Sequence, residues 1–267
     1  MLDYSRTHSG FEPLADDYAP HLWPEAAPYH LRADPPSSTV VLGLHGFRAT
    51  PFELRPVAEA CRAAGLDSAA PLLEGHGYQR RAEQIRAIRC MYARSIEQAI
   101  AIEVGRCRAR GYERVFLYGH SMGGALALRI ASCGLVDAVA VTAPALRLPK
   151  LALLAHLAPP GLDLRIPSPT ERGVENFTYT FDPAQAVLNV LQIAERARAS
   201  LSHVECPVLV VHSHGDATIS PRVGDLVEQG CRGPVERLWF DDSGHCMTLD
   251  VAGERVAAAI ADYFAAL

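Results

Sequence analysis

The chain has 267 residues, of which 49% are hydrophobic and 21% are charged, and its formal net charge is −5. This composition is typical of a globular protein and excludes collagen-like, coiled-coil and disordered chains. Thirty acidic residues against 25 basic ones argue against a protein that neutralises many phosphates, so we do not expect a nucleic acid as partner. Two domains would fit the length, but α/β sheets of this size often fold as one.

The cysteines and the apolar runs bear on location. Seven cysteines are scattered without a Cys-x-x-Cys pair, and an odd number cannot all pair within one chain, so we expect a reducing compartment, the cytoplasm. The N-terminus lacks a basic segment followed by an apolar one, and nowhere do 18 apolar residues follow one another. The sequence therefore predicts neither a signal peptide nor a membrane span. Oligomeric state leaves no trace in the sequence.

The first 37 residues contain six prolines among acidic and aromatic residues. This composition predicts an extended arm with one edge strand near residues 29–32. Residues 39–44 then form a continuous apolar, β-branched run, which suits a strand covered on both faces. A strand of that kind indicates a parallel sheet with helices on either side.

The remaining chain alternates between strand and helix patterns. Strands are predicted at residues 66–71, 114–118, 136–142, 207–212 and 235–240. Helices are predicted at residues 54–64, 122–132 and 251–266, and over 82–110 with room for one break. This succession is typical of a doubly wound, mostly parallel α/β sheet.

The stretch from residue 145 to 203 interrupts the alternation. It contains six prolines and two apolar helical patterns, at residues 151–157 and 184–199. Because it lies between two sheet strands, we expect a helical cap over one edge of the sheet, and a pair of ordinary crossover helices is the alternative. The predicted organisation is an arm (1–37), a core (38–144 and 204–267) and the cap (145–203).

A Gly-x-Ser-x-Gly motif, formed by Gly119, Ser121 and Gly123, connects a predicted strand directly to a predicted helix. In this context the serine sits on a sharp, strained turn, with its hydroxyl exposed above the sheet. The two glycines let the turn form without a Cβ that would collide with neighbouring backbone. Ser121 is therefore the predicted nucleophile.

A serine nucleophile needs a histidine base and an orienting carboxylate, which on this fold follow in the order Ser, Asp or Glu, His. Asp216 lies just beyond the strand at 207–212, and His245 lies just beyond the strand at 235–240. Both are at carboxyl ends of strands, where α/β sheets gather their sites. The sequence predicts a triad of Ser121, Asp216 and His245.

Alternatives for the acid, the base and the nucleophile remain open from the residues alone. His214 is the next candidate base, and Asp241 or Asp242 could replace Asp216. His76 could reach the site only if its loop folds inward, and a structural role is the expectation for it and for Glu74. Cys246, next to His245, is expected to pack rather than to react.

The tetrahedral intermediate of such a reaction needs backbone N–H donors aimed at its oxyanion. One donor is expected from Met122, at the start of a helix, where the helix dipole also favours negative charge. The other is expected from Phe47, in the loop after the strand at 39–44. No spacing of His, Cys and Asp typical of a metal site is present, and neither a metal nor an organic cofactor is expected.

Six blocks of this sequence resemble the α/β-hydrolase superfamily, and within it the bacterial carboxylesterase and monoacylglycerol lipase group. The blocks are residues 44–47, 74–77, 119–124, 143–144, 207–216 and 243–250. The resemblance implies an α/β-hydrolase fold and the triad of Ser121, Asp216 and His245. It also implies a small helical cap after the Ala-Pro block at residues 143–144. The proline-rich arm and the cap sequence depart from the family pattern and leave the acyl-chain preference open.

The expected function is a serine carboxylic-ester hydrolase that acts through an acyl-enzyme on short- to medium-chain esters or monoacylglycerols. A thioesterase or a carbon–carbon bond hydrolase with the same triad is the alternative, as is a non-catalytic ligand-binding protein on a hydrolase scaffold. Apolar strings at residues 151–154 and 187–191 favour a small-molecule ester, and Leu188 and Leu191 are candidates to line its acyl channel.

Overall fold

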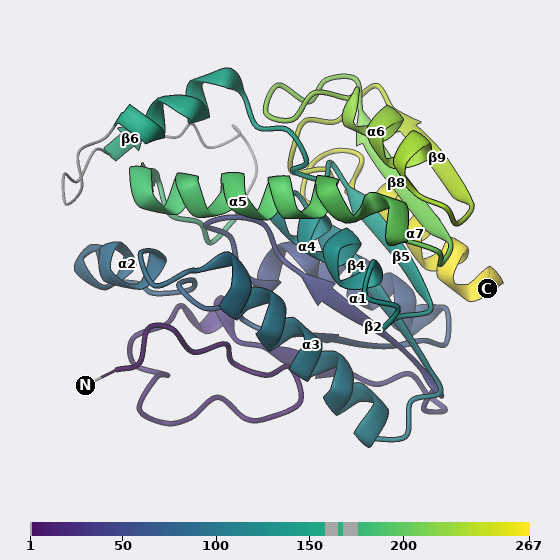
Figure 1. Ribbon diagram of the computed structural model, residues 1–267. Coiled ribbons are helices and arrows are strands. Elements are labelled where there is room, and N and C mark those ends of the chain that lie inside the picture. Colours follow the sequence, from purple (N-terminus) through teal and green to yellow (C-terminus); the bar gives the residue numbers. More distant parts are fainter. Residues whose placement is uncertain (1, 158–164, 168–175) are drawn as a thin grey trace.

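A seven-stranded sheet in the order β1-β3-β2-β4-β5-β8-β9 forms the centre of the computed structural model, which describes residues 2–157, 165–167 and 176–267 (Figure 1). Its strands are β1 (Tyr29–Leu31), β2 (Thr39–Leu44), β3 (Asp67–Ala70), β4 (Arg114–His120), β5 (Ala138–Thr142), β8 (Val208–Ser213) and β9 (Val235–Phe240). The edge strand β1 is antiparallel to β3, and all other neighbouring strands of this sheet are parallel. The predicted mostly parallel sheet is confirmed.

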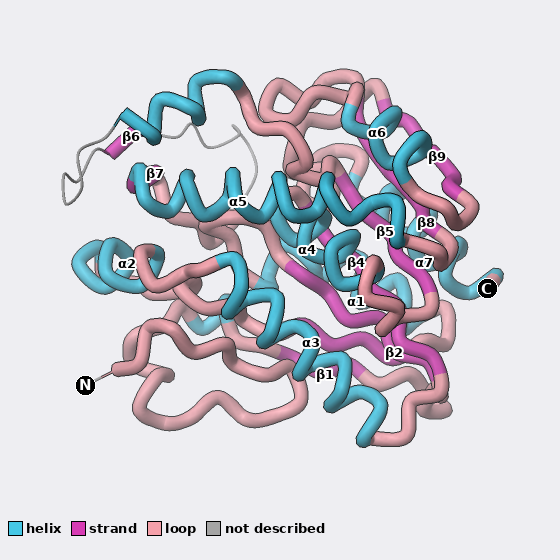
Figure 2. Tube along the Cα trace, viewed as in Figure 1, coloured by secondary structure: helices cyan, strands magenta, loops and turns pink. Residues whose placement is uncertain are grey.

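Helices cover both faces of this sheet, as a doubly wound fold requires (Figure 2). Helices α1 (Arg55–Ala63) and α7 (Gly253–Ala266) pack together on one face. Helices α3 (Ala93–Ala109), α4 (Met122–Ala131) and α6 (Val223–Gly230) pack on the other. Strands β2, β4, β5 and β8 are buried along almost their whole length, because apolar side chains on both of their faces meet helices.

The helices agree with the prediction over residues 82–110 and differ from it in two other places. The stretch 82–110 is divided into α2 (Arg81–Ile88) and α3, so the break is real. A short 3₁₀ helix, Pro51–Leu54, precedes α1. Helix α6 was not predicted, because its eight residues include two glycines, which weaken a helical signal.

The N-terminal arm lies against the loop that follows β3. Antiparallel bridges join His8 to Leu72 and Leu22 to Tyr78. Tyr18 and Leu22 are buried in a small apolar cluster with the same loop residues. The arm is therefore part of the packed molecule. Apart from β1 it is made largely of turns and the 3₁₀ helix η1 (Pro24–Ala26) rather than of extended chain.

The region predicted as a cap contains the 3₁₀ helix η3 (Lys150–Leu157), the two-stranded sheet β6 (Arg165–Pro167) with β7 (Phe181–Pro183), and the long helix α5 (Ala184–Ser200). The pattern at 151–157 is thus a 3₁₀ rather than an α-helix. Helix α5 packs along α4, and Val190 and Ile193 enter the main core (Figure 1). Residues 158–164 and 168–175 of this predicted region lie outside the described residues.

Candidate active site

Ser121 occupies a strained turn between β4 and α4. Its backbone has φ 52° and ψ −114°, a left-handed conformation that a non-glycine residue adopts only where the surrounding structure enforces it. A Cβ on Gly119 would lie 2.3 Å from the Gly123 carbonyl oxygen, and one on Gly123 would lie 1.9 Å from the Leu44 carbonyl oxygen. Both glycines of the motif are therefore required by close backbone contacts.

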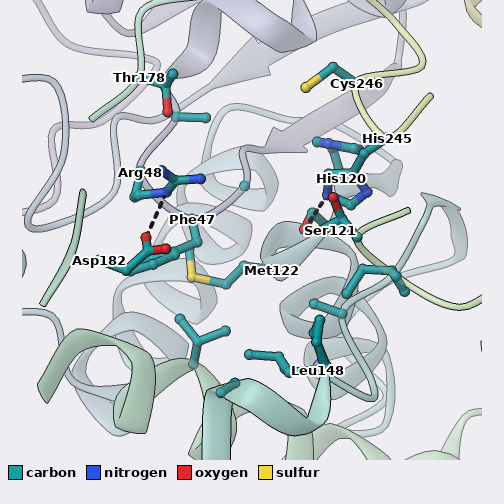
Figure 3. A pocket seen from close by; sticks show the side chains of 18 of the residues that line it. Phe47, Arg48, His120, Ser121, Met122, Leu148, Thr178, Asp182, His245 and Cys246 are labelled. Atoms are coloured by element: carbon teal, nitrogen blue, oxygen red, sulfur yellow. Dashed lines mark hydrogen bonds and ion pairs between the residues drawn. The ribbon is translucent and has the colours of Figure 1, made fainter. Parts of the chain in front are cut away.

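The structure brings Ser121, His245 and Asp216 together in one chain of hydrogen bonds. His245 Nε2 lies 3.0 Å from Ser121 Oγ, and His245 Nδ1 lies 2.8 Å from Asp216 Oδ2 (Figure 3 shows the serine and the histidine). Asp216 and His245 are supplied by the loops after β8 and β9. All three side chains meet at the carboxyl edge of the sheet, as the order of strands along the sequence predicted.

Asp216 is held in its ionised form. Burial by itself raises the pKa of this carboxyl, but hydrogen bonds from His212 and His245 and from the Ile219 N–H outweigh burial and keep the pKa well below its usual value. The Thr218 and Ile219 N–H groups donate to Oδ1 at 2.7 and 2.9 Å. A carboxylate with this many donors orients the histidine without taking its proton.

The rival acid and base residues lie elsewhere. His214 is exposed, stacks on Trp239 and pairs with Asp241 at 2.6 Å, with side-chain exposures of 58% and 88%. Asp242 pairs with Arg255 at the surface. None of these groups lines the cavity at Ser121.

Glu74 and His76 stabilise the loop after β3 and stay outside that cavity. The Glu74 carboxylate accepts from the Tyr92 N–H and from the Ser95 hydroxyl. His76 is buried against the Glu74 carbonyl, and burial lowers the pKa of its ring to about 4. Cys246, by contrast, does contribute to the cavity wall beside His245 (Figure 3).

The loop after β2 faces Ser121. Phe47 and Met122 both line the cavity with Ser121, and a Cβ on Gly46 would lie 3.5 Å from the Ser121 Cβ. His45 holds this loop from behind: its Nε2 accepts from the Leu73 N–H, so Nδ1 carries the proton and donates to the Gly46 carbonyl. Burial keeps the pKa of the His45 ring well below its usual value, so the ring is neutral, and the two hydrogen bonds select the tautomer.

The cavity beside Ser121 has a volume of about 400 Å³ and two chemically different walls. One wall is apolar and comes mainly from the cap and from the segment after β5. It includes Leu148, Leu151, Ala152, Val187 and Val190.

Helix α5 contributes to this wall with a different pair of residues from the one expected. Val187 and Val190, three residues apart and so on one helix face, line the cavity. Leu188 and Leu191 are partly buried against a small apolar cluster that includes Ala155 and Val187, and neither is among the residues that line the cavity. The two candidates named from the sequence thus do not line the cavity, because apolar residues lie around much of α5 and the sequence alone did not show which of them turn towards Ser121.

The other wall is polar, and sequence reasoning missed it. Glu53 is buried, with Oε1 accepting from the Gly46 N–H at 2.6 Å and Oε2 accepting from the Asn176 amide at 3.2 Å. Burial raises the pKa of Glu53 to about 7. Asn176 Oδ1 is buried without a hydrogen-bond partner among the described residues, and Thr178 lies on the same side of the cavity.

An ion pair closes the polar wall. Arg48 Nε lies 3.0 Å from Asp182 Oδ1 (Figure 3), and Arg48 Nη1 donates to the Tyr179 carbonyl. The backbone N–H of Tyr179 donates in turn to the Arg48 carbonyl. The segment that precedes α5 is thus tied to the loop that carries Phe47.

Within the parts of the chain that the structure describes, no group of three or more His, Cys, Asp or Glu side chains could hold a metal ion. None of the described helices is both long and apolar enough to cross a membrane.

Comparisons with known proteins agree with this architecture. The model of the "Alpha/beta hydrolase family" matches residues 41–259. A thermostable monoacylglycerol lipase of Bacillus sp. (strain H-257) is 29% identical over 235 residues, which cover 84% of this chain and 90% of the lipase.

Solved structures give the same result. A structure from work on LipS and LipT, two metagenome-derived lipolytic enzymes, is 27% identical, has a TM-score of 0.82 and covers 92% of this chain and 99% of its own. The monoacylglycerol lipase of Paleococcus ferrophilus, at 19% identity, shares the fold with a TM-score of 0.71 over 90% of this chain and 99% of its own. The resemblance inferred from the six sequence blocks is confirmed, and the chain belongs to the α/β-hydrolase family.

Proposed function

We propose that this hydrolase is a serine carboxylic-ester hydrolase that acts through an acyl-enzyme on Ser121. The observation that carries the proposal is the continuous hydrogen-bonded chain from Ser121 Oγ through His245 to the ionised Asp216, at a strained turn that opens into a cavity. Relatives described as monoacylglycerol lipase and as lipolytic enzymes support ester hydrolysis.

Each group has a defined role in the proposed mechanism. His245 Nε2 removes the hydroxyl proton as Ser121 Oγ attacks the ester carbonyl, and Asp216 stabilises the imidazolium that forms. The N–H groups of Phe47 and Met122 bind the oxyanion of the tetrahedral intermediate. His245 then protonates the departing alcohol, and a water molecule that it activates releases the acid from Ser121.

The two walls of the cavity support a division of the substrate between them. We propose that the acyl chain lies along Val187 and Val190 and that the alcohol lies towards Glu53 and Asn176. Glu53 interacts electrostatically with His245, the residue that protonates the leaving alcohol. The carboxyl of Glu53 and the unpartnered Oδ1 of Asn176 are acceptors, and an alcohol that carries further hydroxyls supplies the donors they lack. A monoacylglycerol has such an alcohol.

The alternative functions differ in what they require of the same cavity. A thioesterase for anionic thioesters would favour an unpaired cation, whereas Arg48 is paired with Asp182 and lies near the acidic Glu53. A carbon–carbon bond hydrolase would leave ester turnover weak. A ligand-binding protein would bind esters without turnover. Side-by-side assays of p-nitrophenyl esters, monoacylglycerols and a thioester separate these cases.

Covalent labelling tests the nucleophile itself. A serine-directed phosphonate should modify Ser121 with complete loss of ester hydrolysis, because a base-activated hydroxyl attacks such reagents. Peptide mass spectrometry locates the adduct, and the Ser121→Ala variant serves as the unlabelled control. An adduct on another residue, or none on a preparation that hydrolyses esters, would rule out the assignment.

Asn176→Ala should reduce kcat/KM for a monoacylglycerol roughly tenfold, because the glycerol hydroxyl loses a hydrogen-bonding partner. The ethyl ester of the same fatty acid has no such hydroxyl, so its kcat/KM should stay unchanged. Initial rates on the two esters give the ratio directly. An equal loss on both esters would contradict hydroxyl recognition by this wall.

Chain-length preference should depend on the face of α5 that lines the cavity. Each buried methylene adds about 0.8 kcal/mol of transfer free energy, so kcat/KM should rise along a p-nitrophenyl ester series until the channel ends, at short or medium chains. Val190→Trp should move this maximum to shorter chains. Leu188→Trp makes the same change at an α5 residue that does not line the cavity, so it is the matched control and should leave the maximum in place. A flat profile, or equal shifts in both variants, would refute this channel.

A cytoplasmic location is likewise a proposal. Its support is that none of the seven cysteines, all of which lie within the described residues, forms a disulfide bond, as expected for a protein in a reducing compartment.

A further inference from the structure

His212 lies near the carboxyl end of β8, four residues before Asp216, and has no solvent exposure. Its Nε2 is 3.2 Å from Asp216 Oδ2 and 3.1 Å from the Ile219 carbonyl oxygen. Asp216 Oδ2 is also the oxygen that accepts the proton of His245 Nδ1. Two imidazoles therefore share one carboxylate oxygen.

The neighbours of His212 determine its tautomer. Both groups near Nε2 are acceptors, one an ionised carboxylate and the other a carbonyl, so Nε2 carries the proton and donates. Nδ1 is buried without a hydrogen-bond partner among the described residues. A second proton there would create a buried, unpaired donor on a charged ring, which is costly. The arrangement therefore requires a neutral ring.

We propose that His212 is a positioning residue of the catalytic triad. The Nε2–H of His212 holds the Asp216 carboxylate in place and weakens the electrostatic stabilisation that this carboxylate gives to protonated His245. The inference rests on the proposed function, because it acts through the triad. Oδ1 is held by two backbone N–H groups and Oδ2 by the two rings, so the carboxylate has one orientation. A donor on Oδ2 also withdraws negative charge from the oxygen that stabilises the His245 imidazolium.

The surroundings contain few groups that could imitate this effect. Trp239 of β9 stacks on the His212 ring at 6.0 Å. Two titratable groups face the His212 ring directly, Asp216 and His120. Beyond Trp239 lie His214 and Arg237. Arg237 is paired with Asp225 and Glu228. Burial lowers the pKa of His120 to about 3, so that ring stays neutral near neutral pH.

His212→Phe removes the donor and keeps a flat ring against Trp239. Without this donor, Oδ2 stabilises the His245 imidazolium more strongly, so the acid limb of kcat/KM should move to higher pH by roughly 0.5 to 1 unit. On the plateau, kcat should fall roughly tenfold with KM unchanged. His212→Gln places an amide N–H near the position of Nε2 and should restore both the profile and kcat.

Trp239→Phe is the matched control, since it alters the packing of the same ring and keeps the hydrogen bond. Its pH profile should coincide with that of the unsubstituted enzyme, and thermal unfolding of each variant checks the fold. Overlapping acid limbs for the unsubstituted enzyme and His212→Phe, or a Gln variant no better than Phe, would overturn the inference.

A measurement on the unsubstituted protein keeps the inference testable if His212→Phe does not fold. The ¹⁵N shifts of the His212 ring should report a neutral ring with its proton on Nε2 across the active pH range, and a proton on Nδ1 would overturn it. Failure of the proposed function is distinguishable, because the unsubstituted protein would then not hydrolyse esters, or Ser121→Ala would hydrolyse them as well as it does, whatever His212 does.

Discussion

Replacing Asp216 with Asn is expected to lower kcat by up to about 10⁴-fold without unfolding the protein. The Asn amide can turn an N–H group towards His245 Nδ1, which then accepts instead of donating. The ring proton moves to Nε2, which faces Ser121 Oγ at 3.0 Å, and the histidine can no longer remove the serine proton. Steady-state kinetics on a soluble p-nitrophenyl ester, with circular dichroism to check the fold, measure the effect.

The rival carboxylates supply the controls for this experiment. Asp241→Asn and Asp242→Asn make the same chemical change in the next strand-end loop, where both side chains are exposed and paired with His214 and Arg255. Each should keep turnover close to that of the unsubstituted enzyme. Near-normal turnover in Asp216→Asn, or a large loss in Asp241→Asn, would transfer the orienting role away from Asp216.

The sequence predicted the sheet and the triad grouping because their determinants are local. A buried strand that runs directly into a helix through Gly-x-Ser-x-Gly can hardly form anything but a sharp turn, and residues just after parallel strands share one edge of a sheet. Ser121, Asp216 and His245 each lie within a few residues of such a strand end. Their meeting therefore follows from strand order alone.

The polar wall could not be predicted in this way. Glu53 and Asn176 are 123 residues apart, neither belongs to a motif, and their contact depends on how the segment before α5 folds back over the loop after β2. The same holds for α5, whose apolar residues lie on both faces. Its rotation is set by packing against α4, and it puts Val187 and Val190 rather than Leu188 and Leu191 at the cavity.

His212 illustrates a different limit. Its place within an apolar β-strand indicates burial and nothing more, since the period of a strand shows which face a side chain occupies but not which polar atom it meets. Only the turn that brings Asp216 back over the end of β8 reveals the hydrogen bond. A polar residue within an apolar strand is therefore assigned to the core by its sequence pattern, and a functional role for it is missed.

Gly123→Ala is expected to be among the most damaging single-atom additions to this enzyme. The new Cβ would lie 1.9 Å from the Leu44 carbonyl oxygen and 2.8 Å from that of His45, and both neighbours are backbone that no rotamer change can move. Relief requires α4 to shift away from β2, at a cost of about 3 kcal/mol or more in the free energy of unfolding. The shift displaces the Met122 N–H and Ser121 from the Phe47 loop, so kcat/KM should fall about 100-fold or more.

Gly105→Ala provides the matched control, because it adds the same methyl group to a helix, α3, at a position where nothing lies within 4 Å. There the substitution should raise stability by roughly 0.5 to 1 kcal/mol through helix propensity and leave kcat/KM unchanged. Urea unfolding and ester kinetics on both variants separate a general effect of alanine from the specific contact at the nucleophile turn. If Gly123→Ala had the stability and the turnover of Gly105→Ala, the close approach of α4 to β2 could not be what holds Ser121 beside the Phe47 and Met122 N–H groups, its proposed oxyanion donors.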